Sequence, residues 1–175
     1  MTKALLLLAL AACGDPVAPP AVDAPPARVV VGTVDASKQG FVPMAGDQTL
    51  VAGAQGGFHV WLKYRVVGLQ ARTVRVLRTV RRVADDRLIL KTDDIVDLGA
   101  PGADGYWELP APVPSFMCPA PLGVQVNDQP VRFEVQLVDP DSSATLADGT
   151  AGATPRCPTA DATQHAFCVS ICSGS

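Results

Sequence analysis

The chain has 175 residues and a nearly balanced charge, with 14 Lys and Arg against 17 Asp and Glu. A net charge of −3 provides no basic surface for nucleic acid, so we expect no nucleic-acid partner. Apolar residues make up 48% of the chain, which is enough for a hydrophobic core and excludes wholesale disorder. The 16 prolines, the 15 glycines and an acidic content that is almost all Asp favour short strands and turns over helices.

The first residues indicate export. Residues 1–12 combine Lys3 with an apolar run that is too short to span a bilayer, which is typical of a secretory signal peptide. The run ends in Leu-Ala-Ala-Cys, which resembles the lipobox of bacterial lipoproteins. That resemblance implies a lipid on Cys13, attachment to a membrane through this lipid, and a place in the cell envelope. Gly14 after the cysteine favours the outer membrane.

A linker precedes the folded part. The segment 15–28 contains five prolines and no residues suited to a core, so we expect residues 13–28 to form an extended tether. Residues 29–175 then form a single β domain. Its predicted early strands are 29–34, 41–44, 49–52 and 58–69.

Period-2 alternation is clearest in residues 58–69, where one face is apolar from Phe58 to Val66. Segment 72–92 reads as a hairpin turning at Asp85-Asp86, although its arginine spacing leaves a helix open. A second hairpin is expected from 123–126 and 131–139, followed by a loop over 140–158. A last strand is expected at 166–172. Together these elements predict an all-β, antiparallel β-sandwich of immunoglobulin-like size.

Four cysteines remain after Cys13, and an even number in an exported chain predicts two disulfides. If 166–172 is a strand, Cys168 and Cys172 lie ~13 Å apart and each bonds to Cys118 or Cys157, which leaves the pairing open. Zinc held by these cysteines and His165 is the alternative. The oxidising envelope favours disulfides, and we expect no metal or cofactor.

Two sets of residues are candidate binding groups. His59 and Trp61 follow one another on the second face of strand 58–69, where they would contact a partner or simply cover the sheet after a turn at Gly56-Gly57. Arg75 and Arg78 belong to a run of arginines that would bind an anionic ligand or face solvent beside nearby aspartates.

The string from Gly53 to Trp61, together with the exported context and the Cys-rich end, resembles a group of uncharacterised exported or lipoprotein β proteins of Gram-negative bacteria. Their shared pattern is approximately G-x-Q-G-G-x-H-x-W. The resemblance implies the same fold and location, and it brings no catalytic residues.

The sequence lacks nucleophile-elbow, zinc-protease and phosphate-loop motifs. We therefore expect a non-enzymatic envelope module that binds another envelope protein or a glycan. The alternatives are an envelope hydrolase using Asp and His residues and a metal carrier with free thiols.

Overall fold

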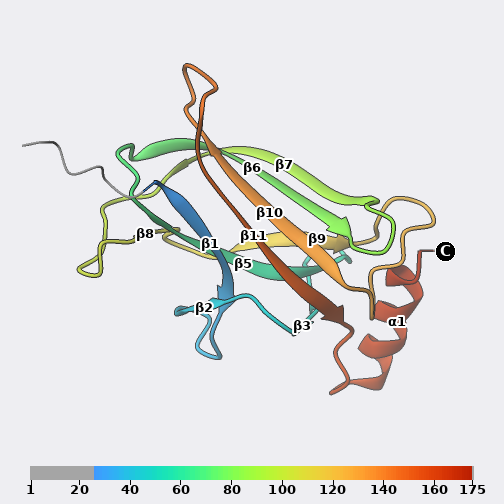
Figure 1. The fold of residues 1–175 in the computed structure, drawn as a ribbon. Helices are drawn as coiled ribbons and strands as arrows, with labels where there is room; N and C mark the ends of the chain where they lie inside the picture. The colour runs from blue at the N-terminus through green and yellow to red at the C-terminus, as the bar shows by residue number, and fades with distance from the viewer. Residues whose placement is uncertain (1–25, 175) are drawn as a thin grey trace, which may run out of the picture.

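The computed structural model describes residues 26–174 and forms two stacked β-sheets with one helix at an end (Figure 1). The predicted signal peptide, Cys13 and most of the tether lie outside the described residues. Within those residues, no helix is both long and apolar enough to cross a membrane. The predicted β-sandwich is confirmed.

The first sheet is built around the long strand β5 (Phe58–Val67). The strand β1 (Arg28–Val34) lies between β5 and β2 (Phe41–Pro43). Three further strands pair with β5 along its length, all antiparallel. They are β4 (Val51–Ala52), β8 (Trp107–Glu108) and β9 (Val113–Cys118).

The second sheet has the order β3-β11-β10-β6-β7. Its strands are β3 (Asp47–Thr49), β6 (Thr73–Arg82), β7 (Leu88–Asp97), β10 (Val131–Val138) and β11 (Thr145–Arg156). All its pairs are antiparallel except β3 with β11, which is parallel. The hairpin reading of 72–92 was therefore correct, with the turn at Asp85-Asp86 between β6 and β7.

The core lies between the sheets, where alternate residues of the longest strands meet. From β5 it receives Phe58, Leu62 and Tyr64, and from β10 it receives Phe133 and Leu137, all of which are almost fully buried. This alternation follows from the pleat of a strand, which sends successive side chains to opposite faces. The amphipathic pattern in the sequence therefore located the core correctly for these strands.

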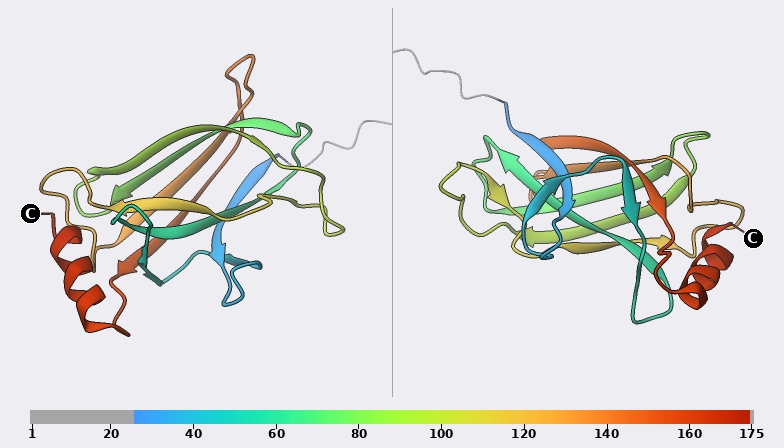
Figure 2. Two further views of the ribbon diagram at one scale, coloured as in Figure 1. Left: turned by 180° about the vertical axis from the view of Figure 1, so that it is seen from behind. Right: turned by 90° about the horizontal axis from the view of Figure 1, so that it is seen from below.

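The C-terminal segment corrects one prediction, because residues 166–172 belong to a helix and not to a strand. The helix α1 (Ala162–Cys172) begins at Asp161, whose carboxylate accepts a hydrogen bond from the Gln164 N–H at 2.7 Å. Such a cap satisfies a backbone donor that the first turn leaves without an intrahelical partner. Figure 2 shows the helix from two further sides, at the end of the sandwich where β11 finishes.

Two other predictions for the C-terminal half were wrong. The segment 123–126 is not a strand but a loop, and its Val126 N–H donates to the Cys172 carbonyl at 2.8 Å. The predicted loop at 140–158 contains the twelve-residue strand β11. The partners of β10 are accordingly β6 and β11.

The two disulfides join α1 to both sheets. Cys118 at the end of β9 bonds to Cys172, and Cys157, just after β11, bonds to Cys168. The expectation that each helix cysteine bonds to one cysteine of the body is confirmed, although the strand geometry behind it was wrong. In the helix the Cys168 and Cys172 Sγ atoms are only 3.8 Å apart.

Candidate functional site

The predicted contact pair His59 and Trp61 lies on the outer face of β5, but His59 is only 5% exposed. Its ring meets the edges of Trp61 at 4.5 Å and Phe116 at 5.7 Å between centroids. Neither imidazole nitrogen has a hydrogen-bond partner in the part of the chain that the structure describes, and burial lowers the pKa of His59. His59 is therefore packed among aromatic rings on the outer face of β5 and presents little surface to a partner.

The glycines before this pair form a tight turn. The Gly56 N–H donates to the Gly53 carbonyl at 3.1 Å, and Gly56 has φ of +83°. The pairing of β5 with β9 shifts register directly after Phe58, as in a β-bulge. The structural interpretation of this string, a turn or bulge followed by side chains that cover the sheet, therefore agrees with the geometry.

Arg75 and Arg78 point to opposite faces of β6. Arg75 lies on the outer face and donates two hydrogen bonds to the Asp93 carboxylate. Arg78 points inward and donates to Asp94 at 2.8 Å. The four predicted binding residues thus lie on three different faces, and the fold does not bring them together.

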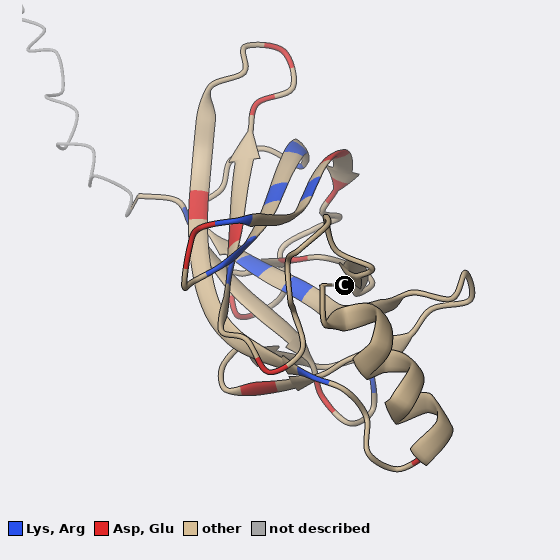
Figure 3. Ribbon diagram, turned by 90° about the vertical axis from the view of Figure 1, so that its right-hand side faces the viewer, with Lys and Arg blue, Asp and Glu red and all other residues tan. Residues whose placement is uncertain are grey.

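The arginine run is matched by aspartates along β7 and its turn. Five ion pairs link the two segments: Arg72–Asp97, Arg75–Asp93, Arg78–Asp94, Arg81–Asp86 and Arg82–Asp85. In Figure 3 acidic and basic positions are interspersed on the side of the molecule that it displays. The aspartates therefore compensate most of the positive charge of the run, and exposed pairs of this kind contribute little to stability.

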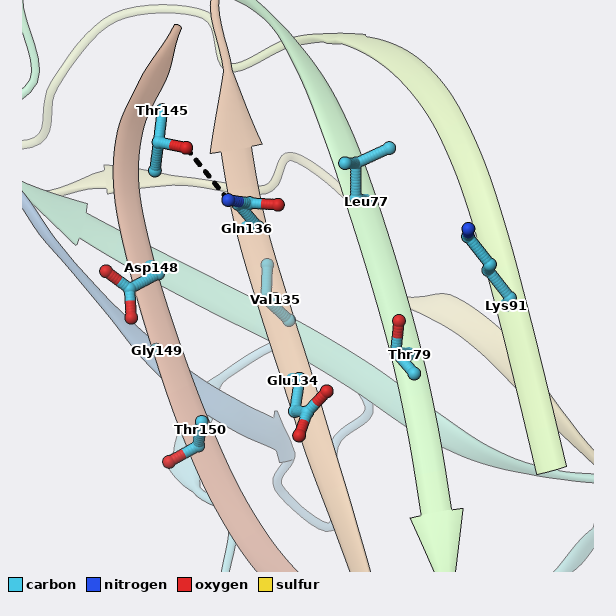
Figure 4. Close-up of a pocket in the computed structure, with 10 residues that line it drawn as sticks. All are labelled: Leu77, Thr79, Lys91, Glu134, Val135, Gln136, Thr145, Asp148, Gly149 and Thr150. Carbon is cyan, nitrogen blue, oxygen red and sulfur yellow. Dashed lines mark hydrogen bonds between the residues drawn. The ribbon is translucent and has the colours of Figure 1, made fainter. Parts of the chain in front are cut away.

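A hollow of about 400 Å³ lies on the outer face of the second sheet, where β11, β10, β6 and β7 run side by side (Figure 4). We call it the sheet hollow. Its lining is polar side chains around one leucine: Leu77, Thr79, Lys91, Glu134, Gln136, Thr145, Asp148 and Thr150. On β6 and β10 they project from the outer face because they occupy alternate positions along the strand, whereas Val135 points into the core. The pairing of β10 with β11 shifts register between Leu137 and Val138, close to Thr145.

Several groups in the sheet hollow have no partner within residues 26–174. The side chains of Thr79, Lys91, Asp148 and Thr150 make no hydrogen bond or ion pair there. The Gln136 amide donates to the Thr145 hydroxyl at 2.8 Å. The hollow therefore offers a ligand the Lys91 ammonium as a donor, threonine hydroxyls that both donate and accept, and the Asp148 carboxylate as an acceptor.

One wall of the sheet hollow is held by ion pairs. The Arg132 guanidinium donates to Glu134 at 2.7 Å and to Asp86 at 2.9 Å. Sequence reasoning missed this site because Asp148 and Thr150 fall in β11, which was taken for a loop. The alternation of polar residues at 132, 134 and 136 was the one signal that pointed to it.

A second polar cluster, also missed, lies on the outer face of the first sheet. Glu108 receives an ion pair from the buried Lys63 and a 2.6 Å hydrogen bond from Arg65 Nε. Burial raises the pKa of Glu108, but the bonds from the two cations outweigh it and the pKa lies below its ordinary value. The Arg65 guanidinium also lies over the rings of Phe41 and Tyr106, at 4.7 and 5.7 Å. Such a fully paired cluster stabilises the loops that cover β5.

Neither histidine has the partner that the hydrolase alternative requires. Among residues 26–174, no carboxylate hydrogen-bonds to either imidazole, and His165 Nδ1 lies 3.1 Å from the Pro158 carbonyl oxygen. The sulfurs of Cys157, Cys168 and Cys172 lie within 4.8 Å of one another. They are bonded in disulfides, so they present no thiolate to zinc.

The sequence matches no protein-family model and no curated protein. Among solved structures, it is similar to part of a calcium-binding mutant of Bacteroides uniformis β-glucuronidase 2, at 13% identity and a TM-score of 0.40. A structure of β-glucuronidase 2 bound covalently to cyclophellitol-6-carboxylate aziridine matches at 13% identity and a TM-score of 0.40. A further Bacteroides uniformis β-glucuronidase structure matches at 14% identity and a TM-score of 0.37. These matches cover 72–73% of this chain and only 13% of each enzyme chain.

Proposed function

We propose that the protein is a lipid-anchored, non-enzymatic module of the cell envelope that binds a glycan in the sheet hollow. The observation that carries the proposal is the group of unpaired polar side chains, including Lys91, Asp148 and Thr150, on one open sheet face. A sugar ring presents hydroxyls that both donate and accept, which complements a carboxylate, an ammonium and hydroxyls at once. The volume of about 400 Å³ lies in the range of small-ligand sites.

The anchoring part of the proposal depends on the sequence. The apolar run in residues 1–12 and the Leu-Ala-Ala-Cys ending at Cys13 support export and lipidation. Two disulfides support an oxidising compartment, because such bonds are rare where thiols are kept reduced. A lipid on Cys13 and the proline-rich tether would hold the sandwich at a distance from its membrane, which we propose is the outer membrane.

A glycan array tests the binding, with the mature protein purified from membranes. We expect selected envelope glycans to bind the native chain, and Asp148→Asn to weaken that binding about tenfold or more, since hydrogen bonds to charged groups contribute about 1.5–3 kcal/mol. Asp141→Asn is the matched control, because Asp141 is exposed in the turn between β10 and β11 and does not line the hollow. Equal binding by both variants would exclude the sheet hollow, and no binding of any glycan would overturn the function.

Intact mass tests the anchor separately. The protein isolated from membranes should begin at Cys13, carry acyl groups there, and gain four alkylatable thiols only after reduction. A chain that still begins at Met1, or four thiols free before reduction, would contradict the envelope proposal.

A further inference from the structure

The sandwich has an open edge that is separate from the sheet hollow. Here β7 ends the second sheet and β9 flanks the first, and each pairs with only one strand. Between them lies a groove of about 380 Å³, which we call the edge groove. The inner faces of β6 and β7 contribute Val76, Arg78, Thr92 and Val96, and β9 contributes Phe116. The edge groove thus combines an apolar surface with a guanidinium.

Arg78 is the central polar group of the edge groove. Its side chain is only 10% exposed, and one nitrogen, Nη2, donates to Asp94 at 2.8 Å. Within residues 26–174, the other terminal nitrogen, Nη1, is buried without a hydrogen-bond partner, and so is the Thr92 hydroxyl oxygen. Buried donors without a partner are rare in folded proteins, so two in one groove point to a ligand that accepts hydrogen bonds.

The charges in the edge groove favour an anion. Asp94 has 49% of its side chain exposed, so water screens its carboxylate far more than it screens the nearly buried guanidinium of Arg78. The pKa of Tyr64, which lines the same groove, depends on both of these charges. Burial raises the pKa of its phenol, and Arg78 opposes that rise more strongly than Asp94 reinforces it. The phenol remains protonated, and of the two charges Arg78 acts on it more strongly than Asp94 does.

The remaining lining is apolar. Val76 and Val96 form one wall, and Phe116, which is 48% exposed, forms the rim. Such a surface suits the hydrocarbon part of a ligand, because burying apolar area is favourable. A sugar or a polyanion would leave much of this wall without a complementary contact.

We propose that the edge groove binds an apolar monocarboxylate, a small organic acid with an aromatic or aliphatic body. The carboxylate accepts hydrogen bonds from Arg78 and Thr92, and the body lies along Val76, Val96 and Phe116. Since Nη1 and the Thr92 hydroxyl oxygen are both buried, binding requires both side chains to turn so that these atoms face the groove. The site lies between the sheets, on the opposite face of the second sheet from the sheet hollow, and does not depend on glycan binding.

The test uses phenylacetate as the probe and phenylacetamide as its neutral isostere. The mature protein, held in nanodiscs and labelled at valine and threonine methyl groups, is titrated with each compound and followed by NMR. Phenylacetate should shift the methyl signals of Val76, Thr92 and Val96 and bind at least tenfold more tightly than phenylacetamide. Equal affinities, or shifts confined to residues outside the edge groove, would overturn the proposal.

Arg78→Met should weaken phenylacetate binding at least tenfold and leave phenylacetamide binding nearly unchanged. Arg75→Met is the matched control, because Arg75 lies on the same strand and is also paired with an aspartate, but points to the outer face. Equal losses in both variants would contradict the site. If Arg78→Met does not fold, the native protein still tests the site. The affinity for phenylacetate is then compared with that for phenylacetamide, and the methyl signals that shift show where the probe binds. Asp148→Asn should leave phenylacetate binding unchanged, which separates this site from the glycan site.

Discussion

Replacing Gly149 by alanine should destabilise the fold strongly, because β11 passes very close to β1 at this position. An ideal Cβ on Gly149 would lie 2.1 Å from the Val29 carbonyl oxygen and 2.8 Å from its carbon. Both neighbours are backbone atoms, so no side chain can rotate away and the sheets would have to separate by about 1 Å. Overpacking costs about 1–3 kcal/mol, and this site belongs at the upper end.

The magnitude follows from two opposing contributions. Alanine in place of a strand glycine favours folding by about 0.5–1 kcal/mol, since glycine loses more backbone freedom. We therefore expect Gly149→Ala to lower the free energy of unfolding by about 2–2.5 kcal/mol. The assay is urea unfolding at pH 7, with the midpoint and the slope compared with those of the native chain.

Gly152→Ala is the internal control. It lies three residues along the same strand, and the nearest atom to its added Cβ is the Val131 carbonyl oxygen at 3.9 Å, an ordinary contact. The free energy of unfolding of this variant should equal that of the native chain or exceed it by about 0.5–1 kcal/mol. If the two alanine variants unfold at the same urea concentration, the close approach of β1 and β11 is refuted.

Three further predictions concern the C-terminal end and the surface. Removing the Cys118–Cys172 bond by double Cys→Ala substitution should lower the free energy of unfolding by about 4 kcal/mol, and removing the Cys157–Cys168 bond should lower it by about 3 kcal/mol. The difference is expected because the bonded cysteines are 54 and 11 residues apart in the sequence, and the longer loop gains more entropy when it is released. Urea unfolding of the two variants measures both losses, and the reverse order would contradict this entropic reasoning. Asp161→Ala should cost about 1 kcal/mol by removing the cap of α1 and Asp161→Asn much less, as measured by thermal unfolding, whereas equal losses would show that the cap contributes nothing. The contribution of the ion pairs to stability should be complete above about pH 5 and should fall as the pH drops towards 2. Hydrogen bonds from Arg82 lower the folded pKa of Asp85 to about 2, and the folded pKa of Glu108 also lies below its unfolded value. A urea unfolding midpoint that does not change with pH over this range would contradict the ion pairs.

The strands that the sequence predicted well are those in which one face is buried under large side chains. Residues 58–67 and 131–138 alternate large apolar with polar groups, and this is the pattern that a half-buried strand requires. The strand β11 could not be found in this way. Its inward positions include Ala147, Gly149 and Ala153, and at Gly149 the backbone of β1 leaves no room for a side chain. Small residues such as glycine and alanine permit the close approach of β1, and they are also the reason that the sequence pattern of this segment predicts a loop.

The helix was missed for a related reason. The apolar residues from Ala166 to Cys172 are dense enough to read as a strand, and only the Asp161 cap and the spacing of Cys168 and Cys172 by four indicate a helix. The polar sites depend on pairings between distant residues. Lys91 and Asp148 line one hollow only because β10 and β6 lie between their strands, which the sequence pattern does not specify.

The position of α1 restricts how the sandwich can open. Because one sulfur bridge connects the helix to β9 and the other to the segment after β11, the two sheets are joined covalently at this end through the short stretch of helix from Cys168 to Cys172. Thermal fluctuations that separate the layers must therefore begin at the far end, near the turn between β10 and β11. Amide hydrogens there should exchange with solvent before those near the helix, and reduction of the bridges should abolish that difference.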